Sequence, residues 1–172
     1  MFNISRASAS PANGQHNPSA AGLEVLRSKD LSQPTHMLKT YIVEDSQVIR
    51  ENLIATLEEL VPVEVVGTAE DESSAVQWLT RPNSRFDLVI IDIFLKSGSG
   101  LGVLRSLRSL SNRPHKLVVL SNYATQDMRD KCGEMGADRV FDKSNEIDAL
   151  LQYCNDLAAN AAPRGNGPAS TT

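Results

Sequence analysis

The chain has 172 residues, 41% of them hydrophobic and 22% charged, which is enough for one domain with a sizeable core. Residues 1–37 hold three basic and two acidic side chains, and residues 160–172 hold one arginine. The remaining 13 basic and 19 acidic groups give residues 38–159 a net charge of −6. This acidic body gives no electrostatic basis for nucleic-acid binding, and the lack of a long apolar run or signal-peptide pattern predicts a cytoplasmic protein without membrane association.

Both ends of the chain have the composition of disordered segments. Seventeen of the first 22 residues are Ala, Ser, Asn, Gln, Gly or Pro, and 158–172 is similarly poor in large apolar side chains. Such segments cannot bury enough surface to offset the entropy lost on ordering. We expect a disordered extension over 1–37, with a marginal helix at 22–31, a folded domain over 38–158 and a disordered tail over 159–172.

Within the predicted domain, short apolar runs alternate with amphipathic segments. Runs typical of strands lie at 38–43, 63–67, 86–91, 115–120 and 137–141. Each is followed by a segment with apolar side chains at helical spacing, at 46–60, 71–81, 100–110, 124–135 and 146–158. Five such βα units predict an α/β fold, a doubly wound five-stranded parallel sheet with helices on both faces.

The first predicted helix has a clear apolar pattern. Five side chains fall on roughly one of its faces: Val48, Ile49, Leu53, Leu57 and Leu60. Either Asp45 or Ser46 is available as the N-cap of this helix. If Asp45 serves as the cap, Glu44 is left for another role.

Parallel sheets of this kind bind ligands at the carboxyl ends of their strands, and polar side chains follow four of the predicted strands. Glu44 and Asp45 follow the first, Asp92 the third, Ser121 the fourth and Lys143 the fifth. Crowded carboxylates repel one another unless a cation joins them. Hard oxygen ligands that leave room for water suit Mg²⁺, so we expect a Mg²⁺ site at this edge.

The same set of residues favours phosphate chemistry. A bound Mg²⁺ attracts a phosphate group and stabilises charge during its transfer. Lys143 adds a point charge for the same anion, and Ser121 adds a hydroxyl donor. An aspartate can act as a covalent nucleophile that forms an acyl phosphate. Asp92 is placed for that role, because it is central and a helix begins nearby at about Gly100.

Four segments, in order along the chain, carry a family resemblance: "YIVEDSQVIRENL", "DLVIIDIFLKSGSGLGVL", "LVVLSNYA" and "GADRVFDKS". Together they resemble the receiver domain of bacterial two-component response regulators, over residues 38–158. Each motif alone is weak, but all of them in order, each at a strand end, are specific. The resemblance implies a flavodoxin-like sheet with strand order 2-1-3-4-5.

The resemblance also implies roles for the residues at the strand ends. Asp92 would be the phosphoacceptor, Ser121 the hydroxyl that turns toward the phosphoryl oxygens, and Lys143 the residue that pairs with the phosphate. The implied Mg²⁺ ligands are Glu44, Asp45, Asp92 and the backbone carbonyl of Phe94.

By the same resemblance, the phosphoryl group would come from a histidine kinase or a phosphotransfer protein. The chain would not be an enzyme, beyond catalysing its own phosphotransfer and dephosphorylation. The sequence outside 38–158 leaves no room for an output domain. We therefore expect a single-domain response regulator that acts in a phosphorelay through contact with a downstream protein.

Some positions depart from the family pattern. Val140 stands where an aromatic switch residue is usual, and Phe141, one residue later, should point to the other face of the sheet. Tyr123 is then the aromatic residue available to contribute from a loop. Ser144 replaces a common proline and is a candidate N-cap for the last helix. These departures concern transmission of a signal and remove no residue that phosphorylation needs.

Two other functions remain open. A degenerate receiver would bind partners independently of phosphorylation, and the altered switch positions motivate it. An aspartate-nucleophile phosphatase would share the acyl-phosphate chemistry, but such enzymes carry a D-x-D pair, and Phe94 occupies its second position here. The segment "KSGSGLG" at 96–102 matches neither phosphate-loop pattern, because its lysine precedes the glycines and Val103 stands where a glycine is needed. We interpret it as the turn that begins the third helix.

Overall fold

The structure is a computed structural model that describes residues 36–109 and 115–161. Most of the two ends predicted to be disordered, and the marginal helix predicted at 22–31, lie outside the described residues. Of the predicted tail over 159–172, residues 159 and 160 are instead helical. Within the described part of the chain, no helix is both long enough and apolar enough to cross a bilayer.

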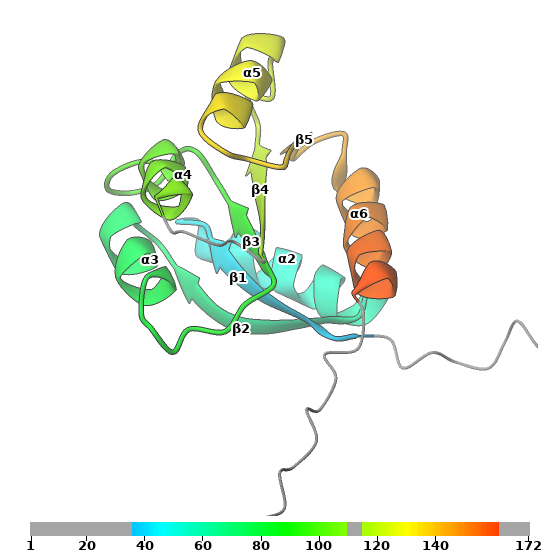
Figure 1. The fold of residues 1–172 in the computed structure, drawn as a ribbon. Helices are drawn as coiled ribbons and strands as arrows, with labels where there is room; N and C mark the ends of the chain where they lie inside the picture. The colour runs from blue at the N-terminus through cyan, green and yellow to red at the C-terminus, as the bar shows by residue number, and fades with distance from the viewer. Residues whose placement is uncertain (1–35, 110–114, 162–172) are drawn as a thin grey trace, which may run out of the picture. The chain divides into compact units, whose positions relative to one another are not determined.

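The described residues form strands and helices that alternate along the chain (Figure 1). The strands are β1 (Leu38–Val43), β2 (Val63–Ala69), β3 (Leu88–Ile91), β4 (Lys116–Ser121) and β5 (Arg139–Asp142). The helices are α2 (Gln47–Leu60), α3 (Glu72–Leu79), α4 (Gly100–Arg108), α5 (Gln126–Glu134) and α6 (Ile147–Asn160). The strands pair in parallel in the order β2-β1-β3-β4-β5, which confirms the predicted sheet and its strand order.

Two apolar cores cover the two faces of this sheet, because successive side chains of a strand point in opposite directions. Val89 and Ile91 of β3 pack in one core with α3, α4 and α5, whereas Leu88 and Ile90 pack in the other with α2 and α6. None of these four side chains is more than 1% exposed. The predicted helices on both faces are therefore confirmed, and β3 is buried from both sides.

The apolar face predicted for the first helix is only partly covered by the rest of the domain. Leu53 and Leu57 of α2 are buried, but Val48, Ile49 and Leu60 are 68%, 38% and 58% exposed. Val48 and Ile49 lie in the first turn, where Ile49 lines an open groove instead of the core. Helical spacing places side chains on one face of a helix, but it does not show how much of that face the sheet covers.

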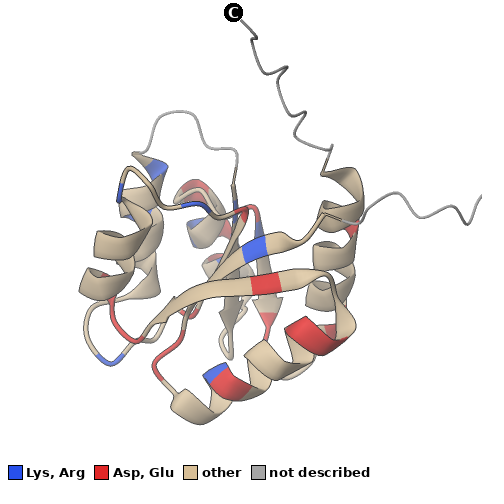
Figure 2. Ribbon diagram, turned by 90° about the horizontal axis from the view of Figure 1, so that it is seen from below, with Lys and Arg blue, Asp and Glu red and all other residues tan. Residues whose placement is uncertain are grey.

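The acidic surplus of the chain is visible along α2 (Figure 2). The exposed carboxylates Glu51, Glu58 and Glu59 accompany a single basic residue in this helix, Arg50. Glu58 and Glu59 lie in the last turn of α2, about three turns from the strand-end carboxylates, and Arg50 neighbours Glu51 near its start. This helix therefore adds little negative charge to the site itself.

The register of the sheet brings the strand ends to one edge. Val43 at the end of β1 pairs with Ile91 at the end of β3. Backbone hydrogen bonds extend the alignment: the Asp92 N–H donates to the Val43 carbonyl at 2.8 Å, and the Lys143 N–H donates to the Ser121 carbonyl at 3.1 Å. The polar residues that follow separate strands are thereby held beside one another.

Candidate functional site

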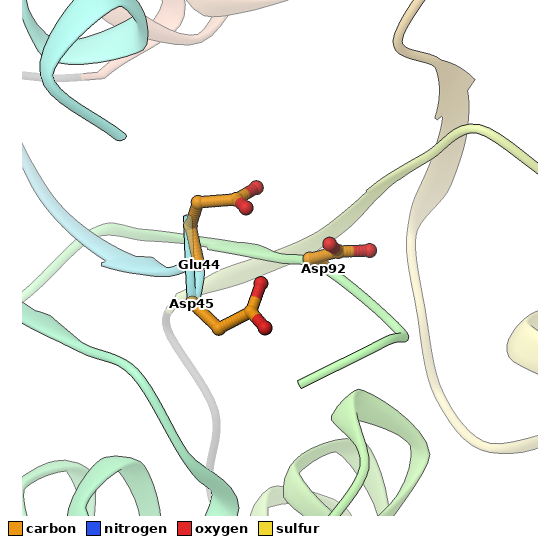
Figure 3. A group of neighbouring side chains, drawn as sticks. All are labelled: Glu44, Asp45 and Asp92. Carbon is orange, nitrogen blue, oxygen red and sulfur yellow. The ribbon is translucent and has the colours of Figure 1, made fainter. Parts of the chain in front are cut away.

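Three carboxylates meet at the carboxyl edge of the sheet. Glu44, Asp45 and Asp92 each offer an oxygen atom, and these atoms lie within 4.8 Å of one another (Figure 3). Glu44 and Asp92 are only 2% and 7% exposed, while Asp45 is half-buried. Hard oxygen donors in this number fit Mg²⁺, which takes few protein carboxylates and retains water. The structure thus brings together the three acidic side chains predicted from the sequence.

Ser46, not Asp45, caps α2. The Ser46 hydroxyl accepts a hydrogen bond from the Ile49 N–H at 3.5 Å, and the Ser46 N–H donates to Glu44 Oε1 at 3.2 Å. The side chain of Asp45 is therefore not used by the helix and lies in the acidic cluster. Of the two possible caps, Ser46 takes this role, and both carboxylates from the end of β1 are left for the site.

Lys143 reaches the cluster from the turn between β5 and α6. Its Nζ donates to Glu44 Oε2 at 2.6 Å and to Asp92 Oδ2 at 2.8 Å. The Lys143 side chain is only 9% exposed, so this is a buried arrangement of one cation between two anions. An anion bonded to Asp92 would lie within reach of the same ammonium group.

The charge on Lys143 is maintained by its partners. Burial is the largest single influence on this lysine and would lower its pKa, because removing an ammonium from water disfavours the charged form. The hydrogen bonds that the ammonium donates to Asp92 and Glu44, and the negative charges of both, act in the opposite direction and outweigh burial. The net result is a raised pKa for Lys143, which is protonated at physiological pH.

Two loops return to the site through main-chain hydrogen bonds. The Phe94 N–H donates to Asp92 Oδ1 at 3.2 Å, and the Tyr123 N–H donates to Ser121 Oγ at 3.3 Å. The rings of Phe94 and Tyr123 are more than half exposed and meet edge to face, with centroids 5.2 Å apart. Ser121 is fully buried. The switch role of its hydroxyl and the metal-ligand role of the Phe94 carbonyl stay predictions.

The region from β5 to α6 agrees with one expectation and contradicts another. Val140 packs in the core beneath α3, α4 and α5, and Phe141 packs in the opposite core, as strand alternation predicts. Ser144 does not cap α6, because that helix begins after Glu146 and the Ser144 N–H donates to Asp142 Oδ1 at 2.7 Å. The turn is closed by its own side chains before the helix starts.

The glycine-rich loop before α4 holds a carboxylate that sequence reasoning missed. The Ser99 N–H donates to Glu72 Oε2 at 2.9 Å, and a Cβ atom at Gly98 or Gly102 would lie only 2.5 or 2.1 Å from atoms of Glu72. Gly98 also has a φ of 78°, which glycine adopts readily. Glu72 thus places a negative charge at the N-terminus of α4, where the helix dipole favours it. No local pattern pairs Glu72 with a loop 27 residues away.

Arg50 is a second residue that sequence reasoning missed. Its guanidinium donates to the Glu44 carbonyl at 2.7 Å and to Glu70 Oε1 at 3.1 Å. It thereby ties the end of β1 to the end of β2, beside the acidic cluster. Its position one turn after the Ser46 cap, close in sequence to Glu44, was the feature of the sequence that could have indicated this contact.

These elements define a doubly wound α/β protein of the flavodoxin-like type, with an acidic pocket at the carboxyl edge of its sheet. Residues 40–155 match the family described as response regulator receiver domain, and the chain belongs to this family. Receivers are the regulated domains of two-component systems. In general they bind Mg²⁺ at an acidic pocket and interact with histidine kinases or phosphotransfer proteins.

Curated bacterial relatives contain this domain within longer proteins. The chain is 32% identical over 132 residues to protein-glutamate methylesterase/protein-glutamine glutaminase 4 of Geobacter metallireducens, an alignment over 77% of this chain and 32% of that protein. It is 25% identical over 130 residues to the transcriptional regulatory protein YdfI of Bacillus subtilis, over 76% of this chain and 57% of that protein. The chain thus spans about a third to just over half of the length of these relatives.

Solved structures share the fold. The response regulator domain of Thermotoga maritima CheB matches with a TM-score of 0.63 at 19% identity, covering 74% of this chain and 100% of that one. The signal receiver domain of NarL from Mycobacterium tuberculosis also matches with a TM-score of 0.63 at 19% identity, covering 73% and 98%. At these identities the likeness concerns the fold alone.

Proposed function

We propose that Asp92 accepts a phosphoryl group from a histidine kinase or a phosphotransfer protein, and that this changes the protein contacts of the chain in a cytoplasmic phosphorelay. The observation that carries the proposal is the setting of Asp92. Its buried carboxylate has Oδ2 2.8 Å from Lys143 Nζ and Oδ1 3.2 Å from the Phe94 N–H, beside two further carboxylates. The single-domain organisation and the downstream target stay predictions.

In the proposed transfer, a carboxylate oxygen of Asp92 attacks the phosphorus atom and the bond from phosphorus to the donor histidine nitrogen breaks. The electron pair of that bond stays on the imidazole, and an acyl phosphate forms on Asp92. The Phe94 N–H orients the carboxylate before attack. Lys143 supplies a positive charge for the phosphoryl oxygens, and the Ser121 hydroxyl donates a hydrogen bond to one of them.

The three carboxylates provide the hard oxygen donors that a divalent cation prefers, which supports a metal site here. Glu44, Asp45 and Asp92, with the Phe94 carbonyl, would hold Mg²⁺. When bound, the ion neutralises charge on the group being transferred. The other contributions described above belong to side chains and backbone groups of this chain.

The test is phosphorylation by acetyl phosphate in Mg²⁺, read as the mass of the intact protein, with beryllofluoride binding as a second measurement. We expect wild type to gain one phosphoryl group and Asp92→Asn to gain none. Asp127→Asn, an exposed carboxylate in the first turn of α5, is the matched control and should behave like wild type. Equal modification of wild type and Asp92→Asn would contradict the proposal.

One observation favours a second candidate, a receiver that binds partners without phosphorylation. Val140 is a small aliphatic side chain within the core, and the exposed pair Phe94 and Tyr123 lies beside the site already assembled. A partner that binds wild type and Asp92→Asn equally, with no phosphate acquired from any donor, would favour this alternative. The phosphatase interpretation requires a second carboxylate at position 94, where the structure instead has the exposed aromatic side chain of Phe94.

A further inference from the structure

Arg129 of α5 connects three separate parts of the chain. Its Nε donates to the Ala124 carbonyl at 3.0 Å, in the loop that follows Ser121. Its Nη1 donates to the Val140 carbonyl in β5, and its Nη2 donates to Glu146 Oε2 at 2.7 Å, just before α6. A planar guanidinium that satisfies acceptors on three elements fixes their relative positions, because its donors are held in one rigid fork.

Glu146 in turn closes the turn that carries Lys143. Its Oε2 accepts a hydrogen bond from the Asp142 N–H at 2.6 Å, and its N–H donates to the Asp142 carbonyl at 2.9 Å. Lys143 follows Asp142 directly, so these two hydrogen bonds join the residue that begins the Lys143 turn to the residue that ends it. The hydrogen bond from Arg129, followed by that from the Asp142 backbone, lowers the pKa of Glu146, which is therefore ionised and a strong acceptor.

The other end of this connection is the site itself. The Lys143 N–H donates to the Ser121 carbonyl, and its Nζ contacts Glu44 and Asp92. Arg129 holds both segments that meet here: the loop after Ser121 through Ala124, and the turn around Lys143 through Glu146. The position of the ammonium group above Asp92 therefore depends on a cation that does not touch the carboxylates.

A merely stabilising ion pair is the competing explanation. The side chains of Arg129 and Glu146 are 32% and 36% exposed, and pairs exposed to this degree contribute little to stability on their own. Two of the three Arg129 acceptors are main-chain carbonyls of the segments that frame the site, and Glu146 also binds main chain. These contacts restrict geometry, which is a different contribution from the attraction between two charges.

We propose that Arg129 and Glu146 are positioning residues that hold Lys143 and the Ser121 loop in register over Asp92, and so set the rate at which Asp92 exchanges phosphoryl groups. This inference rests on the function proposed above. A displacement of about 1 Å in a reacting group can cost up to about 10²-fold in rate. We therefore expect the loss of Arg129 to slow phosphorylation of Asp92 by about tenfold or more.

The experiment compares wild type, Arg129→Gln, Glu146→Ala and Glu146→Gln for the rate of phosphorylation by acetyl phosphate in saturating Mg²⁺. The control is Lys116→Gln, which breaks the exposed Lys116–Asp138 pair at the amino end of β4. Arg129→Gln and Glu146→Ala should be slow and the control close to wild type. Glu146→Gln should be intermediate, because its amide oxygen still accepts the Asp142 N–H. Rates are compared where urea titrations show every variant to be folded.

A second readout separates this inference from the proposed function. The amide and side-chain ammonium resonances of Lys143, observed by NMR, report its geometry whether or not phosphorylation occurs. They should shift in Arg129→Gln and stay unchanged in the control. A phosphorylated wild type with equal rates in all variants would overturn the inference alone. A wild type that is never phosphorylated would overturn the proposed function, and unchanged Lys143 resonances in Arg129→Gln would then overturn the positioning as well.

Discussion

Replacing Lys143 by methionine tests the electrostatics of the site most directly. The substitution keeps most of the side-chain volume and removes the ammonium group, with a thioether sulfur in place of one methylene. At an effective dielectric constant of about 20, contacts of 2.6 and 2.8 Å correspond to roughly 6 kcal/mol of attraction each. Desolvation of the three groups offsets much of this, but breaking a buried pair by removing one partner still costs about 3–5 kcal/mol. We expect Lys143→Met to lower the free energy of unfolding by about 3 kcal/mol, the lower end of the range, because Asp45 leaves one side of the cluster accessible to water.

The assay is urea unfolding at neutral pH, first with a chelator and then with Mg²⁺. Lys96→Met is the matched control, since Lys96 is 72% exposed and lies 3.6 Å from Glu70; its effect should stay below about 0.5 kcal/mol. Adding Asp92→Asn to Lys143→Met should restore stability, because it removes one of the uncompensated charges. Mg²⁺ at about 100 times its dissociation constant should restore about 2.7 kcal/mol. A Lys143→Met variant as stable as Lys96→Met without metal would refute the reasoning.

Three further predictions concern other parts of the chain. Asp71 is the N-cap of α3, and hydrogen bonds from the Ser74 N–H and hydroxyl lower its pKa. The ionised carboxylate therefore stabilises the folded state above the unfolded-state pKa, and this contribution is lost as pH falls through the lower folded-state pKa. Urea midpoints should therefore show a deficit of Asp71→Asn at about pH 6 that closes below about pH 4. Burial raises the pKa of Cys132, and raises that of Cys154 to about 12, so iodoacetamide should label both by mass spectrometry only after unfolding. A Cβ at position 100 would lie 2.1 Å from the Asp92 carbonyl oxygen, so Gly100→Ala should cost about 1–3 kcal/mol in urea and weaken Mg²⁺ binding in calorimetry.

Much of the fold follows from local sequence pattern. The run from Leu88 to Ile91 is apolar without alternation because β3 is buried on both faces, and the residue that ends this run is the site aspartate. Strand direction then determines which side chains meet, so the sequence alone places Glu44, Asp45 and Lys143 near Asp92. The end of the last helix at Asn160, beyond the predicted boundary at 158, is a shift of the usual size for such boundaries.

The remaining features depend on contacts that no local pattern contains. Val48 and Ile49 have core-like spacing but lie in the first turn of α2, beside an open groove. Glu72 fills the space that two glycines leave, and Arg129 binds carbonyls on other elements. Every residue has a backbone carbonyl, so the sequence alone does not indicate which carbonyl an arginine will bind.

The order in which the chain supplies the charges of the site has a consequence for folding. Lys143 follows Asp92 by 51 residues and Glu44 by 99, so all three carboxylates precede the cation that joins two of them. If β1 and β3 pair before β5 joins the sheet, like charges come together without the lysine. We expect this repulsion, added to the entropic cost of non-local pairing, to slow refolding. A divalent cation added at the start of refolding would take the place of the missing lysine, and the folding rate should rise with its concentration.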